Sequence, residues 1–222
     1  AAGQVGIAAN GATLNVNQMT DKAIVNWQSF SNAAGETVRF NQPGTQSVIL
    51  NRVTGANGSV IDGAMSANGK VFLLNPNGIL FGKTANVNTG GLVASTLTMK
   101  DDDFLAGKYK LQQDPSKPMR AVVNQGTINA APGGEVALVA PLVNNEGTIS
   151  APSGRVALAA GTNATITMDE QGLVSLGVRE NVPGAVVVSK DAVSSMLEQA
   201  VNNRHLVDAG SVSESSIALI VP

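Results

Sequence analysis

The sequence predicts a right-handed parallel β-helix, a solenoid whose coils are about 20 to 21 residues long. Three observations carry this prediction: an internal repeat of that length, short β-branched runs between turn residues, and an unusual composition. Glycine supplies 24 of 222 residues, whereas aromatic residues make up 3% and charged residues 14%. Charged residues reach roughly 25% in an average globular domain. Small apolar side chains repeated between glycines suit thin layers that stack many times, rather than one large aromatic core.

The clearest repeat lies between residues 124 and 160. Residues 124–130 (NQGTINA) recur as residues 145–151 (NEGTISA), and residues 132–140 recur, after one deletion, as residues 152–160. A looser copy lies upstream, where the segment that begins at Gly58 corresponds to the one that begins at Gly78. Each copy holds two apolar runs of about four residues, which are too short and too β-branched for helices. Each repeat is therefore interpreted as one coil, and neighbouring coils stack about 4.8 Å apart.

We expect residues 1–222 to form one elongated domain in which residues 1–20 are an N-terminal cap. The open end of a solenoid exposes unpaired strand edges, which must be covered to prevent end-to-end association. Residues 1–20 offer short apolar positions for this task, at Val5, Ile7, Leu14 and Val16. At the other end, residues 217–221 (IALIV) predict a final strand, so we expect the natural chain to continue beyond them.

Two stretches interrupt the coil pattern. Residues 100–120 hold nine charged side chains, whereas residues 40–99 hold four. This charge density predicts an excursion outside the solenoid, with a hairpin around residues 105–111. Residues 189–203 place apolar side chains at helical spacing behind a candidate N-cap, Ser189. They predict a short amphipathic helix packed on the rod.

Charge and cysteine content exclude several classes of partner and chemistry. The formal net charge of −2 and the scattered Lys and Arg residues supply no basic field for phosphates, so nucleic acid is not an expected partner. The absence of cysteine excludes disulfides and thiolate-ligated metals. The first residues show no charged or apolar signal region, so we expect any signal peptide to have been removed or left out. No cofactor and no metal are expected.

The sequence carries no catalytic constellation, and we expect the chain not to be an enzyme. Glycoside hydrolysis needs two carboxylates about 5 to 9.5 Å apart. Glu135 and Glu146 lie in neighbouring repeats, but at positions that are not equivalent. Asp101, Asp102 and Asp103 lack the alternating pattern of a calcium loop, so a solvated loop is the better interpretation. A polysaccharide lyase or hydrolase stays the enzymatic alternative.

The most specific motif occupies residues 75–79, between two apolar runs, and reads NPNGI. It predicts a tight turn, because Pro76 fixes φ and Asn77-Gly78 tolerates positive φ. The motif also resembles the NPNGI motif of the two-partner secretion (TPS) domain, in the haemagglutination-activity family typified by filamentous haemagglutinin. Other segments resemble this family in order and spacing: 23–30, 38–42, 50–54, 90–97 and the Gly-Thr-Ile repeats. The resemblance covers approximately residues 5–167 and is greatest to the high-molecular-weight adhesin branch, because the separate NPNL motif is missing.

The resemblance implies a function in export. Domains of this family lie at the front of long exoproteins of Gram-negative bacteria and cross the periplasm unfolded. The POTRA domains of a dedicated outer-membrane transporter recognise them, and folding at the cell surface then templates the rest of the solenoid. The candidate residues for recognition and folding are Asn75, Pro76, Asn77, Gly78 and Ile79 of the motif, with Asn51 and Arg52 from segment 50–54.

The resemblance also implies where the protein acts and leaves one non-enzymatic alternative. We expect a secreted or cell-surface location, and surface polysaccharide or host glycan as a ligand of the full-length protein. The alternative is an adhesin module that binds carbohydrate or matrix directly. The 3% aromatic content counts against this alternative, because sugar sites commonly use aromatic stacking faces.

Overall fold

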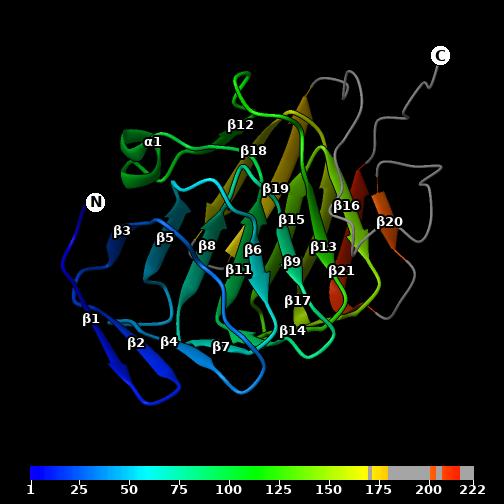
Figure 1. Cartoon of the computed structure of the whole chain (residues 1–222). Helices are drawn as coiled ribbons and strands as arrows, with labels where there is room; N and C mark the ends of the chain where they lie inside the picture. Colours follow the sequence, from blue (N-terminus) through cyan, green and yellow to red (C-terminus); the bar gives the residue numbers. More distant parts are fainter. Residues whose placement is uncertain (170–171, 180–200, 204–206, 216–222) are drawn as a thin grey trace.

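The computed structural model describes residues 1–169, 172–179, 201–203 and 207–215. These residues form a β-solenoid of about seven turns, whose coils stack along one axis from the N-terminal side to the C-terminal side (Figure 1). Parallel pairing joins successive coils, and the strands of each coil lie on three faces. The predicted parallel β-helix is confirmed.

The first face alternates strictly between interior and solvent. On β4 (Thr37–Asn41), for example, Val38 and Phe40 are buried in the core while Arg39 and Asn41 are exposed, as expected where one side of a strand faces water. This face consists of β2 (Thr13–Gln18), β4 (Thr37–Asn41), β7 (Ala64–Ala67), β10 (Asn86–Thr89), β14 (Thr127–Ala130) and the first part of β17 (Thr148–Ala160).

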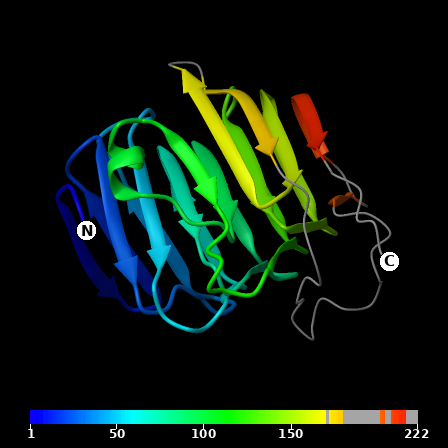
Figure 2. The same ribbon diagram turned by 90° about the horizontal axis from the view of Figure 1, so that it is seen from above.

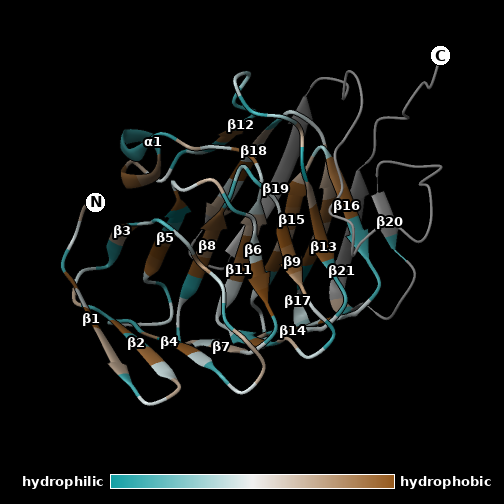
Figure 3. Cartoon of the chain, viewed as in Figure 1, coloured by the Kyte–Doolittle hydropathy of each residue, from teal (hydrophilic) through white to brown (hydrophobic). Residues whose placement is uncertain are grey.

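The second face is buried on both sides. Its central strands are buried at every position, which explains their continuous apolar runs in the sequence (Figure 3): β8 (Lys70–Leu74), β11 (Gly91–Ser95) and β15 (Glu135–Ala140). Strand β17 bends from the first face to the second near Ser153, whose φ is +55°. This face consists of β3 (Lys22–Trp27), β5 (Val48–Val53), β8 (Lys70–Leu74), β11 (Gly91–Ser95), β15 (Glu135–Ala140) and the rest of β17.

The third face is the narrowest, and it closes the coil. Its strands are β6 (Ser59–Ile61), β9 (Ile79–Phe81), β13 (Ala121–Asn124), β16 (Leu142–Asn145) and β20 (Val201–Asn203). A further strand, β21 (Val207–Ser215), pairs in parallel with β17. Side chains from all three faces meet inside the solenoid in one continuous apolar core.

The strand register confirms the repeat. Thr127 pairs with Thr148 and Val136 pairs with Val156, so each residue lies beside its counterpart in the next copy of the repeat. The coil that residues 100–120 interrupt still returns to the stack, because the strand after them, Ala121–Asn124, pairs in parallel with Ile79–Phe81 of the preceding coil. An excursion is therefore inserted into a coil without breaking the ladder.

The N-terminal end of the ladder is an antiparallel hairpin. Strand β1 (Val5–Asn10) pairs antiparallel with β2, and Ala2 forms an antiparallel bridge with Ile24 at the edge of the second face. Val5 and Leu14 pack against the main core. The parallel ladder thus ends in an antiparallel strand on this side.

Residues 100–120 leave the solenoid, but the hairpin expected around 105–111 is wrong. They form helix α1 (Asp101–Leu105) and strand β12 (Tyr109–Gln112). The antiparallel partner of β12 is β18 (Asn163–Asp169), which also pairs with β19 (Gly172–Arg179). Seen from above in Figure 2, the green helix and strand lie across the blue and cyan strands of the early coils. Together these elements cover the outer side of the second face and enclose a second hydrophobic core.

Helix α1 explains the three consecutive aspartates, for which a solvated loop was expected. Asp101, Asp102 and Asp103 form its first turn, where carboxylates lie favourably beside unpaired backbone N–H groups. At the other end, Lys22 Nζ donates a hydrogen bond to the Leu105 carbonyl at 2.8 Å. Within the described ranges, no helix has the length and apolar character needed to cross a bilayer.

The helix predicted over residues 189–203 lies mostly outside the described residues, which omit 189–200. Its last three residues, Val201–Asn203, are not helical but form β20. They pair in parallel with Val143–Asn145, and Asn145 Nδ2 donates a hydrogen bond to Asn203 Oδ1 at 2.9 Å. At these residues, pairing with the neighbouring strand determines the structure, although the spacing of the apolar residues predicted a helix.

Glycines occupy the corners where two coils approach most closely. A Cβ atom on Gly147 would collide with the carbonyl oxygen of Gly126, and one on Gly154 would collide with that of Gly134. None of these four residues has a positive φ, so space rather than backbone conformation requires glycine. The repeated glycines in the sequence therefore mark backbone contacts between neighbouring coils.

We expect Gly147→Ala to lower the free energy of unfolding by about 1 to 3 kcal/mol, because the added methyl group meets backbone that cannot move aside. Gly44→Ala is the matched control, since a Cβ there meets nothing within 4 Å. Its effect should stay within about 0.5 kcal/mol. Equilibrium unfolding in urea measures both changes, and equal stability of the two variants would contradict this account of the corners.

Tyr109, the only tyrosine of the chain, contributes to the second core. Its ring lies 4.9 Å from that of Phe72 and 5.8 Å from that of Phe104, measured between centroids. Burial, and secondly the negative charge of Glu135, raise the pKa of Tyr109 above its ordinary value of 10.0. The folded state therefore holds the phenol proton more tightly than the unfolded state does.

We expect the tyrosinate absorbance of the folded chain to appear at higher pH than that of the urea-unfolded chain. Stability due to this difference is complete below pH 10.0 and is lost as pH rises toward the folded-state pKa. Glu135→Gln should move the folded-state titration of Tyr109 to lower pH, because it removes the negative charge of Glu135. Spectrophotometric titration provides the measurement; coincident folded and unfolded curves would contradict the burial of Tyr109.

Candidate functional site

The NPNGI motif forms the corner between β8 and β9. Gly78 N donates to the Asn75 carbonyl at 3.1 Å, which closes a β-turn with Pro76 and Asn77 at its centre. The side chain of Asn75 supports the same turn, because its Oδ1 accepts from Asn77 N at 2.9 Å. Only Gly78 adopts positive φ, at +108°. The predicted turn is thus present, with the left-handed residue at Gly78 alone.

Asn75 is fully buried, and each polar atom of its amide is used. Nδ2 donates to the Asn57 carbonyl at 3.0 Å and to Ser59 Oγ at 2.9 Å, in the corner of the preceding coil. Oδ1 accepts from Asn77, as described above. The side chain therefore satisfies buried backbone and hydroxyl groups of two coils at once, and an apolar replacement would leave them unpaired.

Asn77 extends the same connection to the preceding coil. Its Nδ2 donates to the Gly55 carbonyl at 2.8 Å and to Asn75 Oδ1 at 3.2 Å. On the opposite side, Asn75 N donates to the Ser95 carbonyl of the following coil at 3.0 Å. The corner consequently joins three successive coils, which is more than a local turn requires.

Asn51, one coil earlier, points into the solenoid. It is fully buried, accepts a hydrogen bond from Trp27 Nε1 at 3.0 Å through Oδ1, and donates to the Phe72 carbonyl at 3.4 Å. Its amide thereby links β3, β5 and β8 inside an otherwise apolar layer. Asn51 acts as a structural crosslink in the interior of the folded chain.

Arg52 points to the outer side of the same strand. Its Nη2 donates to the Met99 carbonyl at 2.7 Å, and its Nη1 lies 2.6 Å from Asp101 Oδ1 and 3.4 Å from Asn26 Oδ1. The guanidinium therefore holds the start of helix α1 against the second face. Its exposed fraction is 19%, so it offers little free surface in the folded domain.

The predicted site residues lie on adjacent coils, but their side chains contact different parts of the fold. Asn51 and Arg52 pair in register with Leu73 and Leu74, immediately before the corner. Their side chains lie on opposite sides of the sheet. Sequence reasoning missed the partners in the preceding corner, Gly55, Asn57 and Ser59. The correspondence of Gly58 with Gly78 in the repeat was the available signal, because it aligns the two corners.

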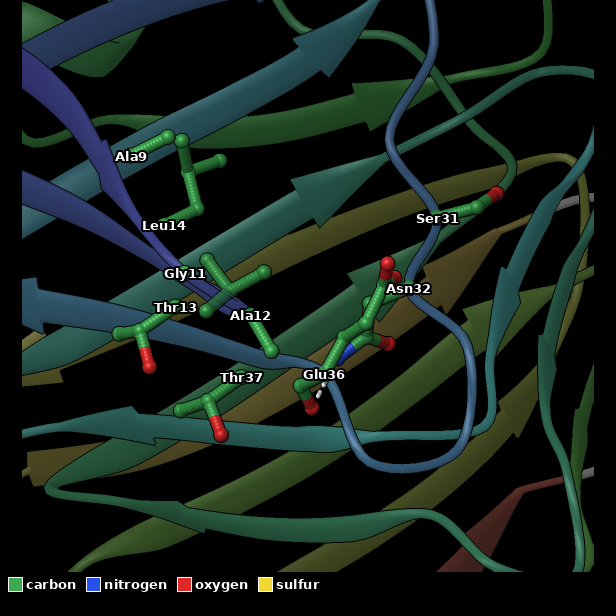
Figure 4. Close-up of a pocket in the computed structure, with 10 residues that line it drawn as sticks. Ala9, Gly11, Ala12, Thr13, Leu14, Ser31, Asn32, Glu36 and Thr37 are labelled. Carbon is green, nitrogen blue, oxygen red and sulfur yellow. Dashed lines mark hydrogen bonds between the residues drawn. The ribbon is translucent and has the colours of Figure 1, made fainter.

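A small pocket lies away from this corner, beside the N-terminal hairpin (Figure 4). The turn after β1 and the segment between β3 and β4 line it. Its polar groups are bonded within the chain, since Glu36 Oε2 accepts from Ala33 N at 2.8 Å and Asn32 Nδ2 donates to the Ala64 carbonyl at 2.8 Å. It holds no pair of carboxylates and no nucleophile with a base.

The fold separates the acidic residues that the sequence offers for catalysis or metal binding. Glu135 is buried on the second face, with Oε1 3.5 Å from Lys70 Nζ. Glu146 lies at the corner after β16 and accepts hydrogen bonds from Gln125 and Asn144. Among the residues whose positions are described, no group of three or more His, Asp or Glu side chains could hold a metal ion.

Comparison with known proteins points to one family. The family model of the TPS secretion domain matches residues 1–220. A heme/hemopexin-binding protein of Haemophilus influenzae strain Rd is 32% identical over 200 residues, covering 87% of this chain and 22% of that protein. Another protein of that name from Haemophilus influenzae is 43% identical over 83 residues, covering 37% of this chain and 9% of its own length.

The fold also matches a solved structure. The crystal structure of the HMW1 secretion domain from Haemophilus influenzae aligns with a TM-score of 0.74 and 31% identity, covering 84% of this chain and 50% of that chain. The chain spans only 22% of the length of the first relative. The comparisons therefore describe a domain rather than the activity of a whole protein.

We expect Asn75→Ala to lower the free energy of unfolding by about 2 to 3 kcal/mol, because Ser59 Oγ and two backbone groups lose their buried partner. Asn86→Ala, an exposed asparagine on the first face, is the matched control and should change stability by less than about 0.5 kcal/mol. Urea unfolding compares them. A loss as small as that of the control would show that the corner is not a structural crosslink.

Proposed function

Because the chain belongs to the TPS secretion domain family, we propose that it is recognised, while unfolded, by the POTRA domains of a dedicated outer-membrane transporter. Members of the family are secretion domains of exoproteins that are exported across the outer membrane. In this proposal the chain reaches the cell surface of a Gram-negative bacterium through the periplasm, after its signal peptide is removed. Folding at the surface then nucleates the rest of the exoprotein.

The observation that supports the proposal is that the fold engages the side-chain amides of the NPNGI corner in hydrogen bonds. Both amides of the motif are bonded to neighbouring coils, and Asn75 is fully buried. A receptor could bond these groups only before the corner forms. Recognition and folding therefore compete for the same side chains, which suits a sequence that must be released from its receptor once it folds.

An extended segment around the motif suits addition to a receptor sheet. Residues 71–82, which contain the motif, hold no charged side chain and place Asn and Gly between two apolar runs. When an extended segment adds as a strand to a receptor sheet, main-chain hydrogen bonds provide the affinity and every second side chain provides the specificity. Asn75 and Asn77 would be two such side chains of an extended chain, because alternate residues of a strand point to the same side.

Folding can supply the direction of transport. Each coil of a solenoid bonds chiefly to the coil before it, so coils that have formed outside the membrane stabilise the next one. Once a coil has folded outside the membrane, its residues no longer slide back into the periplasm. The free energy of folding thereby favours outward movement without a nucleotide.

We expect Asn77→Ala to reduce export through the partner transporter by about tenfold, the effect of losing two amide hydrogen bonds in recognition or in the corner. Asn86→Ala should leave export unchanged. The measurement is the fraction of chain in the culture medium, in cells that carry the chain and its transporter. Undiminished export of a chain that lacks residues 1–100 would contradict the proposal.

Recognition before folding is tested separately with purified components. Chain diluted from urea onto immobilised POTRA domains should be captured, whereas chain allowed to fold first should not be. Asn77→Ala should weaken the capture of unfolded chain, and Asn86→Ala should not. Equal capture of folded and unfolded chain would refute competition between recognition and folding.

A further inference from the structure

The first part of the excursion and the three residues before it form a strap, residues 97–112, that runs back over the early coils. Two cations from the second face hold it in place. Lys22 of β3 donates to the Leu105 carbonyl, and Arg52 of β5 donates to the Met99 carbonyl and pairs with Asp101. These contacts connect the strap to strands that come much earlier in the chain.

Apolar side chains fix the strap over the same strands. Phe104 is fully buried, and its ring centroid lies 5.8 Å from that of Phe72 on β8. Tyr109 packs on Phe72 as well. Early strands contribute the floor of this second core: Ile24, Val48, Leu50, Phe72, Leu74 and Val93. Without the strap, these outward side chains would face water.

The strap depends for its own pairing on residues that come much later in the chain. Strand β12 pairs with β18 in the register Tyr109 to Ile166 and Leu111 to Ala164. Its remaining strand-like contact is the isolated bridge from Gln112 to Thr98, within the strap itself. Ile166 is buried in the second core beside late strands of the second face, which contribute Ala137, Val139, Ala157 and Ala159.

A buried ion pair spans the same region. Lys70 comes from β8 and Glu135 from β15, and 3.5 Å separates Nζ of the first from Oε1 of the second. Strand β11 lies between β8 and β15, and Gly91 on it leaves room for the pair, since a Cβ there would lie 3.2 Å from Glu135 Cδ. Breaking such a pair is costly, because it leaves an uncompensated buried charge.

We propose that the strap is a lock that couples the early coils to the late coils and closes only when β18 has formed. In a simple solenoid each coil contacts only its neighbours, so stability is a sum of local terms. Here β12 and β18 connect β3, β5 and β8 to β15 and β17 through a second layer. For a chain that folds from its N-terminus, the outer side of the second face stays uncovered until residues 163–169 are in place.

The test uses the purified full chain without a transporter, so its result is independent of the proposed secretion function. Trp27, the only tryptophan, reports on the early coils by fluorescence. Ile166→Asp places a charge in the second core, and Thr165→Asp places the same charge on the exposed side of the same strand. We expect Ile166→Asp to lower the urea midpoint of the Trp27 transition by about 1 M and Thr165→Asp to leave it unchanged.

Hydrogen exchange supplies the second measurement on these two variants. Ile166→Asp should expose the amides of α1 and β12 to rapid exchange along with those of β18. The variant could instead lose hydrogen-exchange protection only in β17 and β18 while the urea midpoint of the Trp27 transition stays unchanged. Stability would then depend only on contacts between neighbouring coils, and the proposal would be wrong.

A disulfide variant keeps the test decisive if Ile166→Asp does not fold. The chain has no cysteine, and Lys110 and Thr165 are exposed residues directly opposite each other on β12 and β18. Oxidised Lys110→Cys/Thr165→Cys should raise the urea midpoint of the Trp27 transition above that of the same protein reduced. An unchanged midpoint on oxidation would overturn the proposed coupling.

Discussion

Backbone hydrogen bonds between successive coils hold this protein together, and they require the coils to approach each other closely at every corner. Parallel strands need neighbours on both edges, and the strands inside each ladder find them in the coils before and after. Where the chain turns, a Cβ atom would collide with a carbonyl of the preceding coil, as at Gly147 and Gly154. The glycine-rich composition follows from this constraint, and so does the thin interior of Val, Ile and Leu.

The same constraint explains why many of the buried polar residues carry amide side chains. A corner leaves carbonyl and N–H groups that no strand partner can satisfy, and buried groups of this kind must be bonded. Asn75 and Asn51 each offer a donor and an acceptor within a short side chain, so they bond to adjacent coils without filling the interior. In the later coils, Asn124, Asn145 and Asn203 pass a hydrogen bond from coil to coil in one direction.

The solenoid could be predicted from the sequence because its repeat is local. The alignment of residues 124–130 with 145–151 is the strand register itself, and the NPNGI resemblance led to the family that the comparisons support. The second layer could not be predicted in the same way. The pairing of β12 with β18 joins Tyr109 to Ile166 across an intervening stretch of coils, and no periodic signal marks that partnership. Helix α1 was missed because three aspartates suggest solvent, although they also suit a helix N-terminus.

Arg52 has a role in the fold that the family resemblance does not indicate. The resemblance groups it with the NPNGI motif, yet in the fold its guanidinium binds Met99 and Asp101 at the start of α1. Asn51 beside it binds inside the solenoid instead. Two adjacent residues on β5 thus stabilise different layers, one the coil stack and the other the cover over it. A change at either position would therefore affect folding before it affected any contact with a receptor, and an export defect alone cannot assign either residue to recognition. The amides of the NPNGI corner also stabilise the fold, so the capture of unfolded chain by POTRA domains, rather than export, is the measurement that separates recognition from folding.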